Sequence, residues 1–322
     1  MKAAIVGLGV IGKVHLSILQ KTETETVAVC DIDTAKSVCA PNIPFFSNYI
    51  QMLEEIKPDV VHICTPHYLH ADMVIAALER GVNVLCEKPL CTKREDVARI
   101  LKAERESAAQ LGICLQNRYT PQNMFVKEYL SDKEVEGGFG TVVWHRDEKY
   151  YKSADWRGKW KTEGGGVLIN QALHTLDLMQ WIIGFPISVV ANCSNFALKD
   201  IIETEDTVSA LYHTGDKKFS FYATTSGDCD YPIQITLRTK DEILRVVGKC
   251  VYIGEKVFDF SQQKYFGKSC YGGGHEKLIK EFYNCLSKGE KFMIDGVQGA
   301  KVSSMVFSTY ESNGKWTKIT LE

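Results

Sequence analysis

The sequence KAAIVGLGVIG (residues 2–12) joins a short apolar run to a glycine-rich turn, and it decides the fold of the first half of the chain. Its glycines fit the pattern G-x-G-x-x-G between a predicted strand and a predicted helix. The first glycine of this pattern makes a tight turn, the second lets the backbone approach a pyrophosphate, and the third lets helix and strand pack closely. We therefore predict that a dinucleotide binds to Gly7, Gly9, Val10, Ile11 and Gly12. A plain glycine turn is the alternative.

The choice of cofactor depends on Asp31, which follows the predicted strand 26–30 about 20 residues after the turn. A carboxylate at this position accepts hydrogen bonds from the adenosine ribose hydroxyls and repels a 2′-phosphate. No arginine occurs between residues 31 and 36, although the Lys36 side chain is long enough to reach inward. The sequence therefore predicts NAD as the cofactor, with NADP less favoured.

Apolar strand-like runs alternate with helical patterns over the first third of the chain. Strands are expected at 2–6, 26–30, 60–64, 83–86 and 113–116, and helices at 13–20, 71–80 and 93–109. Such alternation predicts right-handed βαβ units, and hence an α/β Rossmann domain with a doubly wound parallel sheet.

The pattern changes near residues 119–121, and later strand-like runs follow one another with few helices between them. The runs cover 141–151, 187–196, 207–213, 218–224, 233–239, 242–247 and 250–253, and helices are expected at 167–183, 275–287 and 297–312. This series predicts an α+β domain built on an antiparallel sheet. The predicted domains are therefore residues 1–118 and 119–322.

The composition excludes several classes of protein. The 322 residues are 45% hydrophobic and 24% charged, with a formal net charge of −2. These values are typical of a globular protein and exclude a disordered or collagen-like chain, and the charge argues against nucleic acid or an anionic membrane as a partner. Residues 3–11 imitate a short signal peptide, but the glycine turn explains them better. No run is long enough for a membrane span.

Eleven cysteines occur without a C-x-x-C pair, and the histidines at 15, 62, 67, 145 and 213 show no metal-ligand spacing. We expect reduced cysteines that pack as small hydrophobic side chains, which favours a cytoplasmic protein. We also predict that the chain holds no zinc.

Three further motifs carry a resemblance to a known family. They are ICTP (residues 63–66) with His70, CEKP (residues 86–89), and GGGVLINQALHTLD (residues 164–177). Their order and spacing resemble those of the glucose–fructose oxidoreductase, inositol dehydrogenase and MocA family, and the likeness runs from Met1 to about Ser312.

The resemblance implies that residues 1–118 bind NAD, and that residues 119–322 form an α+β domain with a large open, mainly antiparallel sheet. It also implies hydride transfer to or from a hydroxyl or carbonyl of a sugar, cyclitol or nucleotide sugar. Members of the family are often homodimers or homotetramers built through that sheet. The resemblance places further cofactor contacts at Thr65, Pro66, His70, Glu87, Lys88 and Asn117.

The catalytic lysine of the family falls on Lys88, and its aspartate–histidine pair falls on Asn170 and His174, so the aspartate is replaced here. Pro89 holds the backbone of Lys88 extended, and the ammonium would stabilise alkoxide character on a substrate hydroxyl. A surface lysine paired with Glu87 is the alternative.

The predicted helix 167–183 would place Asn170, His174 and Asp177 on one face. His174 suits a base that takes the hydroxyl proton, and the Asn170 amide can donate to and accept from a vicinal diol. A buried histidine that is satisfied by Asp177 is the alternative.

Aromatic and cationic side chains elsewhere are candidates for the substrate pocket. They are Arg118 and Tyr119, which we expect to end the last Rossmann strand, Trp156 and Arg157 in a loop, and, as weaker candidates, Tyr271 and His275 around a second triple glycine. A sugar face stacks well on an aromatic ring, and a guanidinium binds hydroxyls or an anion, but a purely structural loop at 155–160 is nearly as good an explanation.

An NAD-dependent dehydrogenase that acts on a sugar or polyol is the leading hypothesis. The first alternative is a glycosidase-like enzyme whose bound NAD is reduced and reoxidised within one cycle. The second is a non-catalytic NAD-sensing protein, because Rossmann scaffolds also serve regulators.

Overall fold

The computed structural model describes residues 1–262 and 273–321, which divide into two compact units. The first unit contains residues 1–91, 95–115 and 273–300, and the second contains residues 92–94, 116–262 and 301–321. The predicted boundary after residue 118 lies near the change of unit at residue 116. The sequence did not predict that residues 273–300 return to the first unit.

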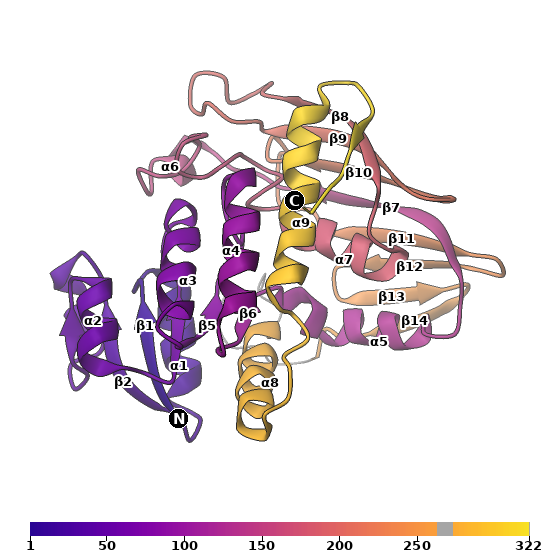
Figure 1. The fold of residues 1–322 in the computed structure, drawn as a ribbon. Helices are drawn as coiled ribbons and strands as arrows, with labels where there is room; N and C mark the ends of the chain where they lie inside the picture. The colour runs from indigo at the N-terminus through magenta and orange to yellow at the C-terminus, as the bar shows by residue number, and fades with distance from the viewer. Residues whose placement is uncertain (263–272, 322) are drawn as a thin grey trace. The chain divides into compact units, whose positions relative to one another are not determined.

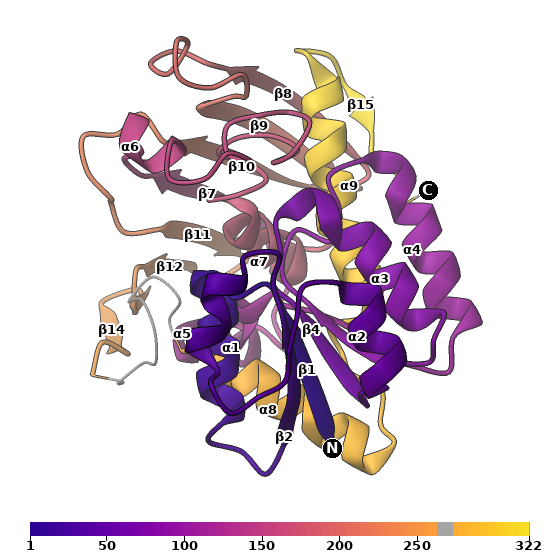
Figure 2. The ribbon, with the colours of Figure 1, turned by 90° about the vertical axis from the view of Figure 1, so that its left-hand side faces the viewer.

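The first unit is built on a six-stranded parallel sheet with strand order β3-β2-β1-β4-β5-β6. The strands are β1 (Lys2–Val6), β2 (Glu25–Cys30), β3 (Phe45–Phe46), β4 (Val60–Ile63), β5 (Asn83–Cys86) and β6 (Leu111–Ile113). The helices are α1 (Val10–Leu19), α2 (Tyr49–Ile56), α3 (His70–Leu78), α4 (Arg94–Glu106) and α8 (Gly274–Lys288), with short 3-10 turns η1 (Thr34–Cys39) and η2 (His67–Leu69). Figure 2 shows α1 on one side of this sheet and α2 and α3 on the other, so the predicted doubly wound Rossmann fold is confirmed.

The second unit is built on a nine-stranded sheet with strand order β14-β13-β12-β11-β7-β10-β9-β8-β15 (Figure 1). The strands are β7 (Val135–Val143), β8 (Ser188–Ser194), β9 (Thr207–Thr214), β10 (Lys217–Thr224), β11 (Gln234–Thr239), β12 (Ile243–Val247), β13 (Cys250–Ile253), β14 (Lys256–Asp259) and β15 (Thr317–Lys318). The helical elements are η3 (Gln116–Tyr119), α5 (Pro121–Tyr129), α6 (Glu148–Tyr151), α7 (Leu173–Ile183) and most of α9 (Gly296–Ser312). The pair β7–β10 is parallel and the other described pairs are antiparallel, which confirms the mainly antiparallel sheet.

Two predicted elements around the candidate site differ from the structure. The predicted strand 141–151 is the end of β7 followed by the short helix α6. The predicted helix 167–183 begins only at Leu173. The Ala172 N–H bonds to the Val167 carbonyl oxygen five residues back, which interrupts the regular α-helical pattern of bonds four residues apart. Asn170 therefore lies in a turn that precedes the helix of His174.

The structure also bears on the cysteines and on a membrane span. The cysteines in the described residues carry free thiols, and most of them are buried. Within residues 1–262 and 273–321 no helix is both long and apolar enough to cross a bilayer.

Candidate functional site

The glycine turn after β1 is shaped by its backbone neighbours. Gly7 has a φ of +89°, and a Cβ on it would lie 2.5 Å from the Cys64 carbonyl oxygen. A Cβ on Gly12 would lie 1.8 Å from the Gly7 carbonyl oxygen. A Cβ on Gly9, in contrast, would meet no described atom within 4 Å. The first and third glycines are therefore required by packing, and the second leaves open space beside the backbone.

The N-terminus of α1 adjoins this open space. Gly9 is the N-cap residue and supplies no side chain to the free N–H groups, and the first turn holds no acidic residue. Val10, the first helical residue, is 59% exposed. Free N–H groups and the positive end of the helix dipole favour an anion at this position. The turn therefore fits the pyrophosphate of NAD.

Asp31 lies at the end of β2 beside the glycine turn. One carboxylate oxygen accepts from the Leu8 N–H at 2.7 Å, and the other accepts from the Asp33 N–H at 3.0 Å. The Lys36 ammonium donates to both oxygens at 3.0 Å, so this side chain does reach inward. Burial alone would raise the pKa of Asp31, but these backbone and ammonium donors hold it below its usual value. The carboxylate is thus fixed as an anion where a ribose would be recognised.

We expect that Asp31→Ala weakens NADH binding about ten-fold or more, because a hydrogen bond to a charged group contributes about 1.5–3 kcal/mol. NADPH binding should fall little or rise, because the repelling charge is lost and Lys36 is released. Fluorescence titration of both cofactors measures the change, with Asp33→Ala as the control because its carboxylate only caps η1. A wild-type protein that prefers NADPH would contradict the role of Asp31.

The loops after β4 and β5 are joined by His70. Its ring is fully buried, with Nδ1 2.7 Å from the Pro89 carbonyl oxygen and Nε2 2.9 Å from the Thr65 carbonyl oxygen. The predicted cofactor residues Thr65 and Pro66 lie partly exposed in the first of these loops. His70 thus ties these loops together, and its contact with the cofactor stays a prediction.

Lys88 is partly buried directly after the carboxyl end of β5, the edge at which parallel sheets bind ligands. The side chain of its neighbour Glu87 is buried and used internally. One oxygen lies 3.0 Å from His15 Nε2 and 3.1 Å from His275 Nε2, and the other accepts from the Lys88 N–H at 3.3 Å. The predicted contact of Glu87 with the cofactor therefore competes with a strong internal set of donors.

His15, Glu87 and His275 form a cluster that the linear spacing of histidines did not predict. One ligand atom from each lies within 4.8 Å of the others, so the set could hold a metal ion by residue type. Both His–Glu distances are nevertheless those of hydrogen bonds, which satisfy these atoms without an ion. The absence of zinc stays a prediction.

His174 lies in the first turn of α7, in the second unit. Its Nε2 is 3.0 Å from the amide nitrogen of Gln116 in η3. An amide nitrogen only donates, so Nε2 accepts and the neutral ring carries its proton on Nδ1. The orienting residue Gln116 was not predicted from the sequence, because it precedes His174 by 58 positions.

The described hydrogen bonds of Asp177 join it to Arg118 and Gln180. Its carboxylate receives two bonds from Arg118, from Nε at 2.8 Å and from Nη2 at 2.6 Å, and a third from Gln180. The Asp177 side chain is 1% exposed and that of Arg118 is 5% exposed. Arg118 was predicted to bind substrate, but the structure gives its guanidinium to this buried ion pair.

Asn170 contacts a carboxylate that the sequence analysis missed. Its amide donates to the buried Glu163 and lies 3.4 Å from the Tyr150 hydroxyl. The second Glu163 oxygen accepts from the Gly158 N–H at 2.5 Å. An acidic residue directly before the triple glycine 164–166 was the available signal. Position 170 lacks the aspartate that the family resemblance implies, but the Glu163 carboxylate contacts the residue at this position.

The loop 155–160 packs against Tyr150 from α6. The Arg157 guanidinium lies 4.4 Å from the Tyr150 ring centre and 4.6 Å from the Trp156 ring centre, and it donates to the Tyr150 hydroxyl. Gln171 donates to the same hydroxyl at 3.0 Å. Burial raises the pKa of Tyr150, although Arg157 opposes the rise. Trp156 and Arg157 thus lie in one polar cluster with Tyr150, Glu163 and Asn170.

Asn117 and Tyr119 lie in η3 and are partly buried, in a 3-10 turn rather than at the end of a Rossmann strand. Tyr271 lies outside the described residues.

We expect that Asn170→Asp makes the stability of the fold depend on pH, because two buried carboxylates would then face each other. One of them would keep a proton in the folded state, so the free energy of unfolding should fall as the pH rises through its raised pKa. Compared with wild type, the loss should reach about 1–3 kcal/mol at pH 8 and nearly vanish below about pH 4, the pKa of an unfolded aspartate. Urea denaturation at both pH values measures it.

The double variant Asn170→Asp/Glu163→Gln exchanges the carboxylate and the amide and should recover most of the stability at pH 8. An equal loss in both variants would show that the Asn170–Glu163 contact does not carry the effect.

Family profiles match both parts of the chain. A profile described as "Oxidoreductase family, NAD-binding Rossmann fold" matches residues 1–114, and one described as "GFO/IDH/MocA C-terminal domain" matches residues 134–248. D-glucoside 3-dehydrogenase of Escherichia coli K12 is 28% identical over 208 residues, which is 61% of this chain and 58% of that protein. Inositol 2-dehydrogenase of Salmonella typhimurium LT2 is 29% identical over 57% of this chain and 54% of that protein. The chain thus spans little more than half the length of these curated relatives.

Solved structures match over the whole length. The WlbA dehydrogenase from Bordetella pertussis, in complex with NADH and UDP-GlcNAcA, is 27% identical with a TM-score of 0.87, and covers 100% of this chain and 99% of its own. Levoglucosan dehydrogenase in complex with NADH has a TM-score of 0.84 at 19% identity and shows the shared fold alone. The two matching profiles together cover more than half of the sequence. The chain therefore belongs to the NAD-binding oxidoreductase family of glucose–fructose oxidoreductase, inositol dehydrogenase and MocA.

Proposed function

We propose that the chain is an NAD-dependent dehydrogenase that acts on a hydroxyl or carbonyl group of a sugar, cyclitol or nucleotide sugar. The observation that carries the proposal is the glycine turn after β1, with open space at Gly9 and the fixed Asp31 carboxylate beside it. The dehydrogenase names of the relatives and the NADH bound to the structural neighbours support it.

The cofactor would be held by the N–H groups at the start of α1 and by Asp31. When bound, NAD supplies the acceptor for the hydride of the substrate. Lys88 and His174 would act on the reacting hydroxyl: the lysine ammonium donates to its oxygen, and His174 Nε2 takes its proton. These roles follow the family resemblance and the chemistry of the two groups.

The substrate class that we favour is a nucleotide sugar. The support is the 27% identity over the full length to WlbA dehydrogenases, whose structures contain UDP-GlcNAcA. We also propose a cytoplasmic homodimer or homotetramer that forms through the nine-stranded sheet. Large exposed apolar side chains on its strands support that interface: Phe139, Tyr222, Ile243 and Val257.

A cofactor-reduction screen tests the proposed function. Purified protein is mixed with NAD and a panel of nucleotide sugars, aldoses, sugar acids and cyclitols, and nicotinamide absorbance is followed, with Lys88→Met as the inactive control. Turnover of at least one compound by wild type alone is the expected result. Retained, reduced cofactor without net turnover would instead indicate a glycosidase-like cycle. Tight NADH binding with no change over the whole panel would indicate a sensor.

A further inference from the structure

A chain of buried hydrogen bonds runs within the first unit from Tyr283 to Glu87. The Tyr283 hydroxyl lies 2.9 Å from His62 Nε2, and His62 Nδ1 lies 2.8 Å from His15 Nδ1. His15 Nε2 then lies 3.0 Å from Glu87 Oε1. All three distances are within hydrogen-bond range, and both histidine rings are fully buried. Four side chains from α8, β4, α1 and the end of β5 are thus linked.

The charge of Glu87 determines the position of each proton in this chain. An ionised carboxylate only accepts, so His15 Nε2 carries a proton. In a neutral His15 ring Nδ1 must then accept, and His62 Nδ1 must donate. His62 Nε2 is left as an acceptor for the Tyr283 hydroxyl. Every donor in the chain therefore points toward Glu87, and such aligned hydrogen bonds polarise one another.

The groups around this chain favour an ionised Glu87 and neutral His15 and His62 rings. Burial alone would raise the pKa of Glu87, but the hydrogen bonds from His15 and His275 hold it well below its usual value. Burial lowers the pKa of His15 and of His62, so both rings are neutral near pH 7. The other titratable groups that face Glu87 are neutral thiols with pKa values raised by burial, Cys64, Cys86 and Cys114, together with His70. Asp59 adds to the raised pKa of Tyr283, and the charged side chains of Glu23 and Lys280 line the same pocket as its ring.

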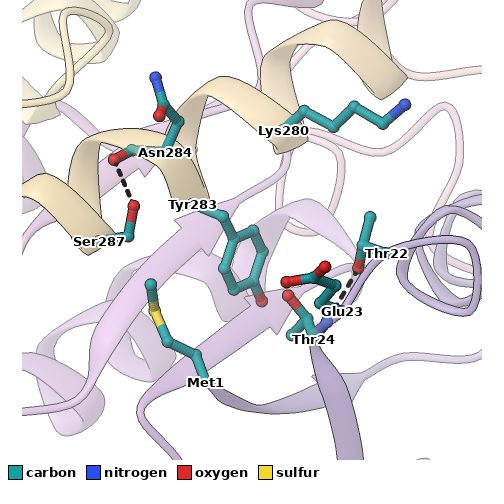
Figure 3. A pocket seen from close by; sticks show the side chains of 8 residues that line it. All are labelled: Met1, Thr22, Glu23, Thr24, Lys280, Tyr283, Asn284 and Ser287. Atoms are coloured by element: carbon teal, nitrogen blue, oxygen red, sulfur yellow. Dashed lines mark hydrogen bonds between the residues drawn. The ribbon is translucent and has the colours of Figure 1, made fainter.

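The far end of the chain reaches a surface pocket. Figure 3 shows the Tyr283 ring among the side chains that line this pocket, beside Met1 and Thr24, with Lys280 further along the same helix. Met1 and Thr24 precede β1 and β2, whereas Glu87 follows β5. Since the strands are parallel, the pocket lies at the amino edge of the sheet and Glu87 at the carboxyl edge. The hydrogen bonds therefore cross the sheet from one edge to the other.

We propose that Tyr283, His62 and His15 form a proton path between this pocket and Glu87, the neighbour of Lys88. The inference rests on the proposed function in one respect, that Lys88 is the reacting lysine. In an inward transfer, a hydronium ion protonates the Tyr283 oxygen while the Tyr283 proton moves to His62 Nε2. The His62 Nδ1 proton moves to His15 Nδ1, and the His15 Nε2 proton moves to the Glu87 carboxylate.

This transfer balances in atoms and charge. Each of the three bridging groups gives one proton and receives one, so only hydronium and the carboxylate change charge, to water and carboxylic acid. The reverse transfer retraces the same bonds. A dehydrogenase exchanges one proton with solvent in every turnover, and in this proposal Glu87 takes up that proton by the inward transfer and returns it by the reverse one.

The first test reads the proton positions directly and needs no substrate. Nitrogen-15 NMR of the histidine rings in the wild-type protein should show His15 protonated on Nε2 alone and His62 protonated on Nδ1 alone near pH 7. In Tyr283→Phe the His62 signals should change, since Nε2 loses its donor. A His62 ring that carries its proton on Nε2 would break the derived order and overturn the path, whatever the enzyme's activity.

The second test measures proton transfer in turnover, on a substrate found by the screen. Tyr283→Phe should lower the single-turnover rate about ten-fold, less than the loss of a direct acid–base group, and increase the H₂O/D₂O isotope effect. KM and the affinity for NADH should not change. Tyr49→Phe is the matched control, because Tyr49 is equally buried and also loses one hydrogen bond, to Met73 O at 2.9 Å. If both variants keep the wild-type rate and isotope effect, the chain is structural and the path is wrong.

Discussion

Replacing His174 by alanine should lower kcat by about 10²–10⁴-fold, the usual contribution of a positioned acid–base group. The Gln116 amide donates to Nε2 of this ring, so a substrate hydroxyl would have to replace that bond before its proton could move to the Nε2 lone pair. Oxidation by wild type should rise with pH as the ring loses its proton, and this limb should be absent from the variant. Steady-state rates between pH 5 and pH 9 measure both effects.

Two comparisons make this result specific. His213→Ala, in β9 and only partly buried, should leave kcat within about two-fold of wild type. Lys88→Ala should lower kcat with little change in NADH affinity, because its bond to the substrate oxygen strengthens as negative charge develops there. A His174→Ala protein with full activity and an unchanged pH profile would remove His174 from the mechanism.

Replacing Asp177 by alanine should cost about 3–5 kcal/mol of the free energy of unfolding, the usual penalty for breaking a buried ion pair from one side. The Arg118 guanidinium would keep its charge in a site from which water is excluded, and its two bonds to Asp177 would be lost. Urea denaturation followed by circular dichroism measures the loss.

The exposed pair Arg146–Asp230 provides the control. Its nitrogen–oxygen distance is 2.8 Å, close to the 2.6 Å of Arg118–Asp177, but the Asp230 side chain is 55% exposed. Asp230→Ala should therefore cost about 0–1 kcal/mol. The double variant Arg118→Met/Asp177→Leu should be more stable than Asp177→Ala, because no unpaired charge stays buried. Similar losses for Asp177→Ala and Asp230→Ala would contradict this account.

The sequence predicted the Rossmann sheet well, because its strands are set by local pattern. The buried strand β4 is an unbroken apolar run apart from His62, and the glycine turn identifies the β1–α1 junction. The short strand β3 and the helix α2 were missed. β3 has only two residues, and α2 is short, with a buried face of only Tyr49, Met52 and Leu53.

The candidate site was predicted less well, because its contacts join distant residues. The start of α7 was misplaced because the turn before it is held by Glu205, which accepts from the Gly166 and Leu168 N–H groups across 37 to 39 positions. The hydrophobic periodicity of a sequence window cannot indicate a partner that lies so far along the chain. Burial raises the pKa of Glu205 to about 7, against the effect of these donors. The internal hydrogen bonds of Glu87 were also not predicted, because its partners His15 and His275 lie 72 and 188 positions away.

The return of residues 273–300 to the first unit has a consequence for how the protein is made. Phe282 of α8 covers Gly112 so closely that a Cβ there would lie 2.9 Å from the ring, and the Ile113 N–H bonds to the Ile294 carbonyl at 2.9 Å. During translation these partners leave the ribosome about 180 residues after β6. Until then the nascent Rossmann sheet has one strand edge unpaired and one apolar surface uncovered. Its folding should therefore finish only as synthesis of the chain ends, rather than in the amino-to-carboxyl order usual for consecutive domains.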